Sequence, residues 1–252
     1  MKKVYLGNKQ LTTLATREEG GGGGNDELAK SLIDRSITSV DITNGVTIIG
    51  QYAFGKCESL SSVTIPNSVT IIGSYAFYIC KSLSSIDIPS SVTIIGDYAF
   101  YNCNSLSSID IPSSVTSIGS SAFRYCSSLS SITIPSGVTS IDDYAFDNCT
   151  SLSSITIPNS VTSIDSSTFG YCSSLSSITI PNSVTSINGY AFRGCSSLAD
   201  VTIASTTKLE YKTNAFQNIA SNAVLRVPSS LVDAYKADSN WTNAFGGGIV
   251  AI

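Results

Sequence analysis

The sequence predicts a β-rich repeat solenoid whose coils share a parallel β-sheet. All seven cysteines recur every 23 residues, at Cys57, Cys80, Cys103, Cys126, Cys149, Cys172 and Cys195. Phenylalanine and proline recur with the same period, and apolar residues alternate before each proline. A fixed period of this length is typical of solenoids, in which each repeat is one coil and neighbouring coils bury each other's apolar faces.

One coil, from Leu60 to Ser82, reads LSSVTIPNSVTIIGSYAFYICKS. The alternation of Val63 and Ile65 predicts a strand with one face in the core. Pro66 lacks an N–H group and should end that strand. A turn and a second extended segment over residues 69–73 follow. The same string begins again at Leu83, Leu106, Leu129, Leu152 and Leu175.

The count of coils follows from where this pattern begins and ends. A degenerate first coil starts at Ile37, and a late coil opens at Leu198. One residue is then inserted, because Phe216 lies 24 residues after Phe192. Leu225 continues the register with that offset. We therefore expect nine strand passes.

Two ladders of identical side chains should fill the core. The Tyr75-Ala76-Phe77 tripeptide supplies the largest core side chain of its coil. Its equivalents form a column of Phe54, Phe77, Phe100, Phe123, Phe146, Phe169 and Phe192. The cysteines are odd in number and share one slot, which favours buried free thiols over disulfides. Without histidine or Cys-x-x-Cys spacing, the sequence predicts no metal site and no cofactor.

The string L-x-x-I-x-I-P-x-x-V-x-x-I-x-x-x-A-F-x-x-C over residues 37–228 resembles the BspA-type leucine-rich repeat. The stretch from Leu225 to Phe245 also looks like the end cap of such proteins from gut bacteria. This resemblance implies a leucine-rich repeat coil. It also implies adhesion or recognition, because members of the family are mostly surface-exposed or secreted proteins.

Both ends of the solenoid should be capped, since open coil faces would otherwise be exposed. We divide the chain into an attachment segment or tail (1–19), a glycine linker (20–24), an N-terminal cap helix (25–36), the solenoid (37–228) and a C-terminal cap (229–252). Residues 3–8 are expected to form a strand and turn. A helix over 25–35 should turn Leu28, Leu32 and Ile33 inward.

The C-terminal cap is expected to contain a short helix over residues 229–238. Ser229 or Ser230 is its predicted N-cap, because serine side chains accept hydrogen bonds from free N–H groups at a helix start. The single tryptophan, Trp241, is expected to pack with Phe245 as a core residue of the cap.

Charge and composition argue against several functions. The 14 basic and 18 acidic residues form no basic stripe, so we expect no nucleic-acid binding. No apolar run is long enough to insert into a membrane, and the N-terminus does not read as a signal peptide. Without histidine there is no histidine-based catalytic triad. We therefore expect a protein that is not an enzyme.

Candidate contact residues lie in the two variable slots that follow the phenylalanine column. Tyrosine and arginine, which are enriched at recognition hot spots, occupy several of these slots. The predicted binding residues are Tyr78, Tyr101, Arg124, Tyr125, Tyr171 and Arg193. The expected partner is a protein or glycan on a cell surface or in the extracellular matrix. The sequence indicates no particular oligomeric state.

Two further patterns have simpler interpretations. Asp87 and Asp110 point outward from adjacent strands, and we expect a solvated surface there and not an active site. A threonine recurs in the second extended segment, at Thr47, Thr70, Thr93, Thr116, Thr139, Thr162 and Thr185. A flat exposed threonine array could bind ice, but a structural hydroxyl ladder is the favoured interpretation.

Two alternatives to an adhesion module stay open. A bacteriophage tail-fibre or receptor-binding virion protein would explain both the lack of an export signal and the reduced thiols. A structural spacer or an ice-binding surface is the other alternative. The expected location is the cell surface or the extracellular space by family resemblance, or the virion under the first alternative.

Overall fold

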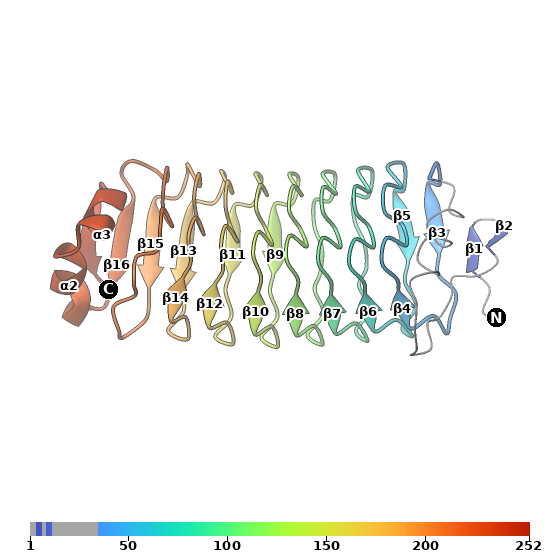
Figure 1. Cartoon of the computed structure of the whole chain (residues 1–252), viewed down its shortest axis with the longest axis horizontal. Helices are drawn as coiled ribbons and strands as arrows, with labels where there is room; N and C mark the ends of the chain where they lie inside the picture. Colours follow the sequence, from blue (N-terminus) through green and yellow to red (C-terminus); the bar gives the residue numbers. More distant parts are fainter. Residues whose placement is uncertain (1–3, 7–8, 12–34) are drawn as a thin grey trace.

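The computed structural model, which describes residues 4–6, 9–11 and 35–252, is an elongated solenoid of stacked coils (Figure 1). The predicted glycine linker and the predicted helix over 25–35 lie outside the described residues, apart from Arg35. The chain progresses coil by coil from one end to the other. This shape follows because each coil buries its apolar side chains against its two neighbours.

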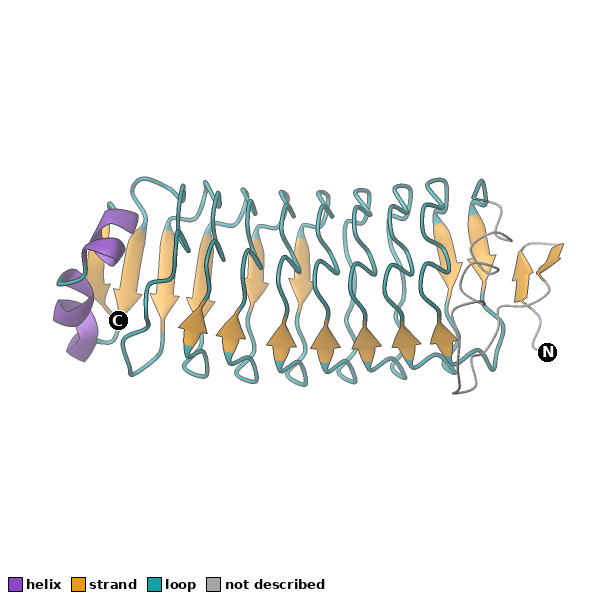
Figure 2. Cartoon of the chain, viewed as in Figure 1, coloured by secondary structure: helices purple, strands orange, loops and turns teal. Residues whose placement is uncertain are grey.

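The first strand of each coil contributes to a row of short parallel strands along the solenoid (Figure 2). The row contains β3 (Ser39–Asp41), β5 (Ser62–Thr64), β9 (Ser131–Thr133), β11 (Ser154–Thr156), β13 (Ser177–Ile180), β15 (Asp200–Ile203) and β16 (Val224–Val227). Val40 lies opposite Val63, one repeat apart. Between β5 and β9 the row continues as single bridges from Asp87 to Asp110 and from Asp110 to Thr133. The nine predicted passes are confirmed.

A tenth parallel strand, which the sequence did not predict, closes this row. Strand β17 (Gly248–Ala251) pairs with β16, with Ile249 opposite Leu225. It begins at the last of three consecutive glycines and lacks the repeat pattern, so periodicity gave no signal for it. Ile249 is buried, and the strand therefore extends the core beyond the last repeat.

The second extended segment of each coil forms a second row of strands (Figure 2). Its members are β4 (Ile48–Ile49), β6 (Ile71–Ile72), β7 (Ile94–Ile95), β8 (Ser117–Ile118), β10 (Ser140–Ile141), β12 (Ser163–Ile164) and β14 (Ser186–Ile187). These strands pair in parallel, and the second residue of each is buried. The core lies between the two rows.

Stacked phenylalanines run through the core, as predicted. Neighbouring rings from Phe54 to Phe192 lie 5.3–5.6 Å apart between centroids, and the column continues to Phe216 at 5.1 Å. Each of these side chains is at most 1% exposed. Burying one large apolar side chain contributes roughly 1.5–3 kcal/mol, so this column is a major source of stability.

The cysteines form the predicted ladder of buried free thiols. From Cys80 onward, each thiol donates a hydrogen bond to the carbonyl oxygen of the phenylalanine 26 residues earlier, at 3.1–3.3 Å. That phenylalanine lies in the preceding coil, so the thiols bind neighbouring coils together. Burial raises the pKa of each of these thiols above its ordinary value.

Hydroxyl groups link the turns between coils. Ser68 donates to the carbonyl oxygen of Val46 at 2.7 Å, and Ser114 repeats this bond to Val92 at 2.6 Å. In the threonine ladder, Thr70 donates to the carbonyl of Thr47 at 3.1 Å. Threonines 93, 116 and 185 make the same bond. These hydroxyls are used within the ladder, as the structural interpretation predicted.

The first strand of the solenoid has a partner on its outer edge. Strand β1 (Val4–Leu6), which matches the predicted strand, pairs antiparallel with β2 (Lys9–Leu11) and with β3. In the second pairing, Tyr5 lies opposite Asp41. An edge strand with an open row of N–H and C=O groups can pair with other chains, and β1 covers this one.

The C-terminal cap contains a turn of 3₁₀-helix, η1 (Ser229–Leu231), followed by α2 (Val232–Lys236) and α3 (Ser239–Ala244). The predicted serine N-cap is wrong: α2 is preceded by Leu231, and no side chain caps it, because the serines lie within η1. Trp241 is fully buried, stacks with Phe245 at 6.1 Å and contacts Phe216 at 5.7 Å. It is therefore a core residue of the cap, as predicted.

Candidate binding surface

The predicted contact residues lie in a turn that each coil forms around its core phenylalanine. Two residues of this turn have a left-handed backbone conformation. The residue two places before each phenylalanine has φ between 54° and 61°, and the residue before each cysteine has φ between 56° and 74°. Only one residue of this second set, Gly194, is a glycine. This conformation is uncommon for residues with a side chain. It is repeated because the stacked coils on either side fix it.

A tyrosine stack that the sequence analysis did not identify begins this surface. Tyr52, Tyr75 and Tyr98 occupy the first left-handed position, and their rings stack at centroid distances of 4.4 and 4.7 Å. All three are half-buried. Their signal in the sequence was the recurrence of tyrosine two places before the phenylalanine of most coils.

Three of the predicted tyrosines adjoin this stack. Tyr78 packs edge-on against Tyr75 at 5.5 Å and stacks with Tyr101 at 5.1 Å. Tyr101 in turn meets Tyr125 at 5.4 Å. Tyr125 is 36% exposed, so the row ends in an accessible ring.

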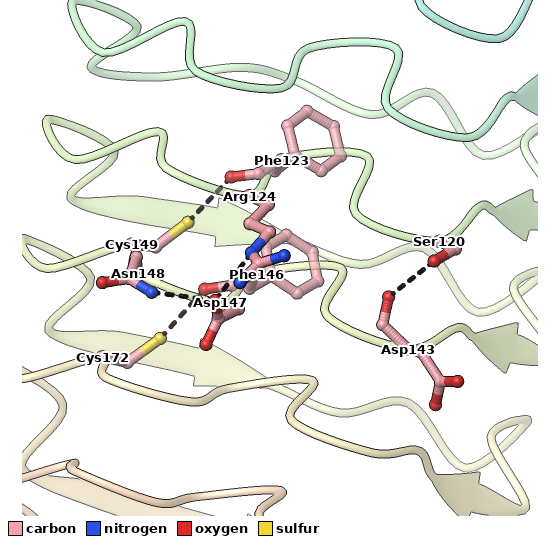
Figure 3. A network of polar contacts seen from close by, with 9 residues as sticks. All are labelled: Ser120, Phe123, Arg124, Asp143, Phe146, Asp147, Asn148, Cys149 and Cys172. Carbon is pink, nitrogen blue, oxygen red and sulfur yellow. Dashed lines mark hydrogen bonds and ion pairs between the residues drawn. The ribbon is translucent and has the colours of Figure 1, made fainter.

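Arg124 extends the same row towards the next coil. Its guanidinium lies 5.0 Å from the ring of Tyr125 and 4.7 Å from the ring of Tyr144. Its Nε donates to Oδ2 of Asp147 at 2.8 Å, and Asn148 donates to the same oxygen (Figure 3). The cation–π contacts of Arg124 with the two tyrosine rings contribute about 0.5–2 kcal/mol each. The arginine is therefore held in place by two rings and a carboxylate.

The charges of this pair influence each other. Burial raises the pKa of Asp147 above its ordinary value, although hydrogen bonds from Asn148 and Arg124 oppose that shift. Burial lowers the pKa of Arg124, but the charge and hydrogen bond of Asp147 outweigh it, and the pKa of Arg124 is raised. Gly170 makes room for the carboxylate, because a Cβ there would lie 2.5 Å from Oδ1 of Asp147.

The last two predicted residues, Tyr171 and Arg193, form a second cluster with Tyr190. The guanidinium of Arg193 lies 5.6 Å from the ring of Tyr171 and 5.3 Å from that of Tyr190. Gly194 is required beside them: its φ is +74°, and a Cβ there would lie 2.5 Å from the ring of Tyr171. Tyr171 is 42% exposed.

We call these two clusters together the tyrosine ridge. The first cluster consists of Tyr52, Tyr75, Tyr78, Tyr98, Tyr101, Arg124, Tyr125 and Tyr144, and the second of Tyr171, Tyr190 and Arg193. The structure thus places four predicted residues in one cluster and two in another. Sequence reasoning missed the five tyrosines that precede the phenylalanine column.

Outside the tyrosine ridge, the other exposed features show weaker signs of a binding site. Asp87 and Asp110 are exposed neighbours on the first strand row, as expected for a solvated surface. Among residues 35–252 and the two N-terminal strands, no group of three or more His, Cys, Asp or Glu side chains could hold a metal ion. In the same part of the chain, no helix is long and apolar enough to cross a bilayer.

The family model of the BspA type leucine rich repeat region matches residues 30–150 and 116–236, with six copies. The chain therefore belongs to the BspA-type leucine-rich repeat family. A comparison with curated proteins finds no significant match.

Solved structures of bacterial leucine-rich repeat proteins are similar to this chain. One from Bacteroides ovatus shares 29% identity at a TM-score of 0.61, covering 75% of this chain and 63% of that one. The T. pallidum leucine-rich repeat protein shares 34% identity at 0.51, covering 56% and 65%. A leucine rich cell surface protein from Faecalibacterium prausnitzii shares 31% identity at 0.48, covering 85% and 60%. In each case less than two thirds of the other chain is spanned.

Proposed function

We propose that this protein is a non-catalytic binding module that recognises a protein or glycan on a cell surface through the tyrosine ridge. The observation that carries the proposal is the ridge itself: tyrosines and arginines gather at half-buried or exposed positions of an otherwise repetitive coil. Tyrosine and arginine are enriched among the residues that dominate binding energy.

The scaffold suits such a role. The ridge residues stand on turns held by stacked coils, and their rings are already packed against one another before any partner binds. A surface ordered in advance loses little conformational entropy on binding. Rigid repeat proteins commonly use extended surfaces of this kind.

A location at the cell surface or outside the cell is part of the proposal and rests on the family resemblance. The absence of catalysis is also proposed, since the chain has no histidine and the paired carboxylates Asp87 and Asp110 are exposed to solvent. A catalytic carboxylate pair needs environments that separate the two pKa values.

Flow cytometry of the labelled chain on a panel of gut bacteria and on epithelial cells tests this function. The matched variant is Tyr78→Ser with Tyr101→Ser, because Gly55 and Gly170 occupy the same slot in other coils and small residues are therefore tolerated there. We expect staining by the native chain and its loss in the variant.

The cell type stained separates the alternatives. Selective staining of bacterial strains would favour a phage receptor-binding protein, and staining of epithelial cells or their matrix would favour an adhesin. Absence of staining, or equal staining by the variant at unchanged melting temperature, would reject the ridge as the contact surface and leave a spacer role.

A further inference from the structure

Among the described residues, Arg193 differs from Arg124 in its lack of a carboxylate partner. Each guanidinium lies within 6 Å of two tyrosine rings, but only Arg124 has a carboxylate partner, Asp147 at 2.8 Å. In the part of the chain that the structure describes, Arg193 has no ion pair, and its buried Nε has no hydrogen-bond partner.

The sequence explains this difference. Tyr125 N–H donates to the carbonyl of Asp147, and Gly194 N–H donates to the carbonyl of Gln217. Gln217 therefore holds, beside Arg193, the position that Asp147 holds beside Arg124. The side chain at this position is a neutral amide in Gln217 and a carboxylate in Asp147. Gln217 therefore does not neutralise the positive charge of Arg193.

We propose that Arg193, flanked by Tyr171 and Tyr190, binds an acidic side chain of a partner protein. A guanidinium presents paired N–H donors that match the two oxygens of a carboxylate. The two rings hold the side chain in place and limit the rotamer entropy lost when the carboxylate binds. The inference rests on the proposed function, since it assigns a partner to one end of the tyrosine ridge.

The ring arrangement favours a peptide over an acidic sugar. A sugar ring stacks on an open aromatic face, and the guanidinium of Arg193 already lies over the rings of both Tyr171 and Tyr190. Tyrosine hydroxyls both donate and accept hydrogen bonds, which suits contacts with peptide groups. The net charge of −4 also works against non-specific attraction of anions, so binding should depend on this one residue.

Fluorescence anisotropy with a labelled hexaglutamate peptide at about 150 mM salt tests the proposal. Hexaglutamine and a glucuronate-containing tetrasaccharide serve as comparison probes. We expect hexaglutamate to bind and Arg193→Gln to weaken it about tenfold or more, as for a hydrogen bond to a charged group. Arg193→Lys should restore only part of the affinity, because lysine cannot bind in a bidentate manner.

Arg226→Gln is the matched control. It removes one positive charge, but Arg226 is already paired with Asp200 at 2.9 Å, so we expect no more than a twofold change. Equal loss in both variants, no loss in Arg193→Gln, binding of hexaglutamine as tight as that of hexaglutamate, or binding of the tetrasaccharide alone would overturn the inference.

The outcome is separable from that of the proposed function. If Arg193→Gln does not affect hexaglutamate while Tyr78→Ser with Tyr101→Ser still abolishes cell staining, the acidic-partner inference fails and the ridge function stands. If hexaglutamate binding depends on Arg193 but the tyrosine variant stains cells normally, the ridge function fails and the acidic-partner inference stands.

Discussion

The thiol of Cys149 donates a hydrogen bond of 3.2 Å to the main-chain carbonyl oxygen of Phe123, one coil earlier in the solenoid (Figure 3). The same oxygen accepts the N–H of Cys126 at 3.1 Å. The two core ladders are therefore coupled: from Phe54 to Phe169, each phenylalanine carbonyl of the column receives one donor from its own coil and one from the next. This bond needs a protonated thiol, which makes the fold sensitive to alkaline pH.

Alkaline pH should destabilise the protein through these thiols. Burial raises the pKa of six of them, and to about 12 for Cys126 and Cys195. The folded state therefore keeps protons that the unfolded chain releases above about pH 8.5. The contribution of the thiols to the free energy of unfolding is fully present below that pH. It falls as pH rises, by about 1.4 kcal/mol per pH unit for each thiol.

Urea unfolding under reducing conditions between pH 7 and 9.5 measures this effect. The double variant Cys126→Ala with Cys149→Ala should show a shallower dependence, because two thiols no longer titrate. A free energy of unfolding that stays constant from pH 8 to 9.5 would show that the thiols are not protected from ionisation.

Ile79→Asn should stabilise the solenoid. Ile79 has φ of 59°, and a β-branched residue is strained in this left-handed region. Asparagine tolerates the conformation better and already occupies the same position at Asn102 and Asn148. We expect a gain of about 0.5–1 kcal/mol by urea unfolding. The reciprocal change Asn102→Ile should cost a similar amount, and a gain from that change would contradict the argument.

These left-handed positions also explain what the sequence could not predict. The period predicted the coil, the strand rows and both core ladders, because each slot meets one environment repeated along the axis. The tyrosine stack from Tyr52 to Tyr98 was missed because nothing in a tyrosine marks a left-handed backbone. Only Gly194 and a few asparagines did so. Strand β17 was missed because it pairs without repeating the pattern.

Loss of Arg124 should destabilise the protein in a pH-dependent way. Arg124→Ala leaves the carboxylate of Asp147, whose side chain is 4% exposed, without its cation. Removing one partner of a buried pair costs about 3–5 kcal/mol at neutral pH. The pKa of Asp147 is already raised by burial and should rise further, so its ionised form in the folded state is what costs stability. The penalty should grow as pH increases above the unfolded value, near 4, and shrink below it.

Unfolding of Arg124→Ala at pH 7 and at pH 4 measures this dependence. Adding Asp147→Asn should restore much of the stability at pH 7, because an amide carries no charge to leave unpaired. An equal loss at both pH values would mean that the arginine contributes only through its packing against Tyr144.

Removal of the C-terminal cap should cause aggregation. Deleting residues 229–252 removes β17, Trp241 and Phe245, which exposes the edge of β16 and one side of Phe216. An open edge of a parallel sheet is a template for pairing with other chains. Size-exclusion chromatography and thermal melting of the truncated chain check this; a monomer with unchanged melting would contradict the capping role.

The central claim is that the tyrosine ridge is the surface that contacts the partner. Tyrosine nitration followed by peptide mass spectrometry, on the free chain and on the chain bound to the cells that it stains, tests this claim most directly. Among the tyrosines of residues 35–252, Tyr125, Tyr144 and Tyr171 are the most exposed and should react in the free chain, whereas the buried Tyr235 should not. We predict that binding protects these three exposed rings; nitration at the same rate in the bound chain would contradict the claim.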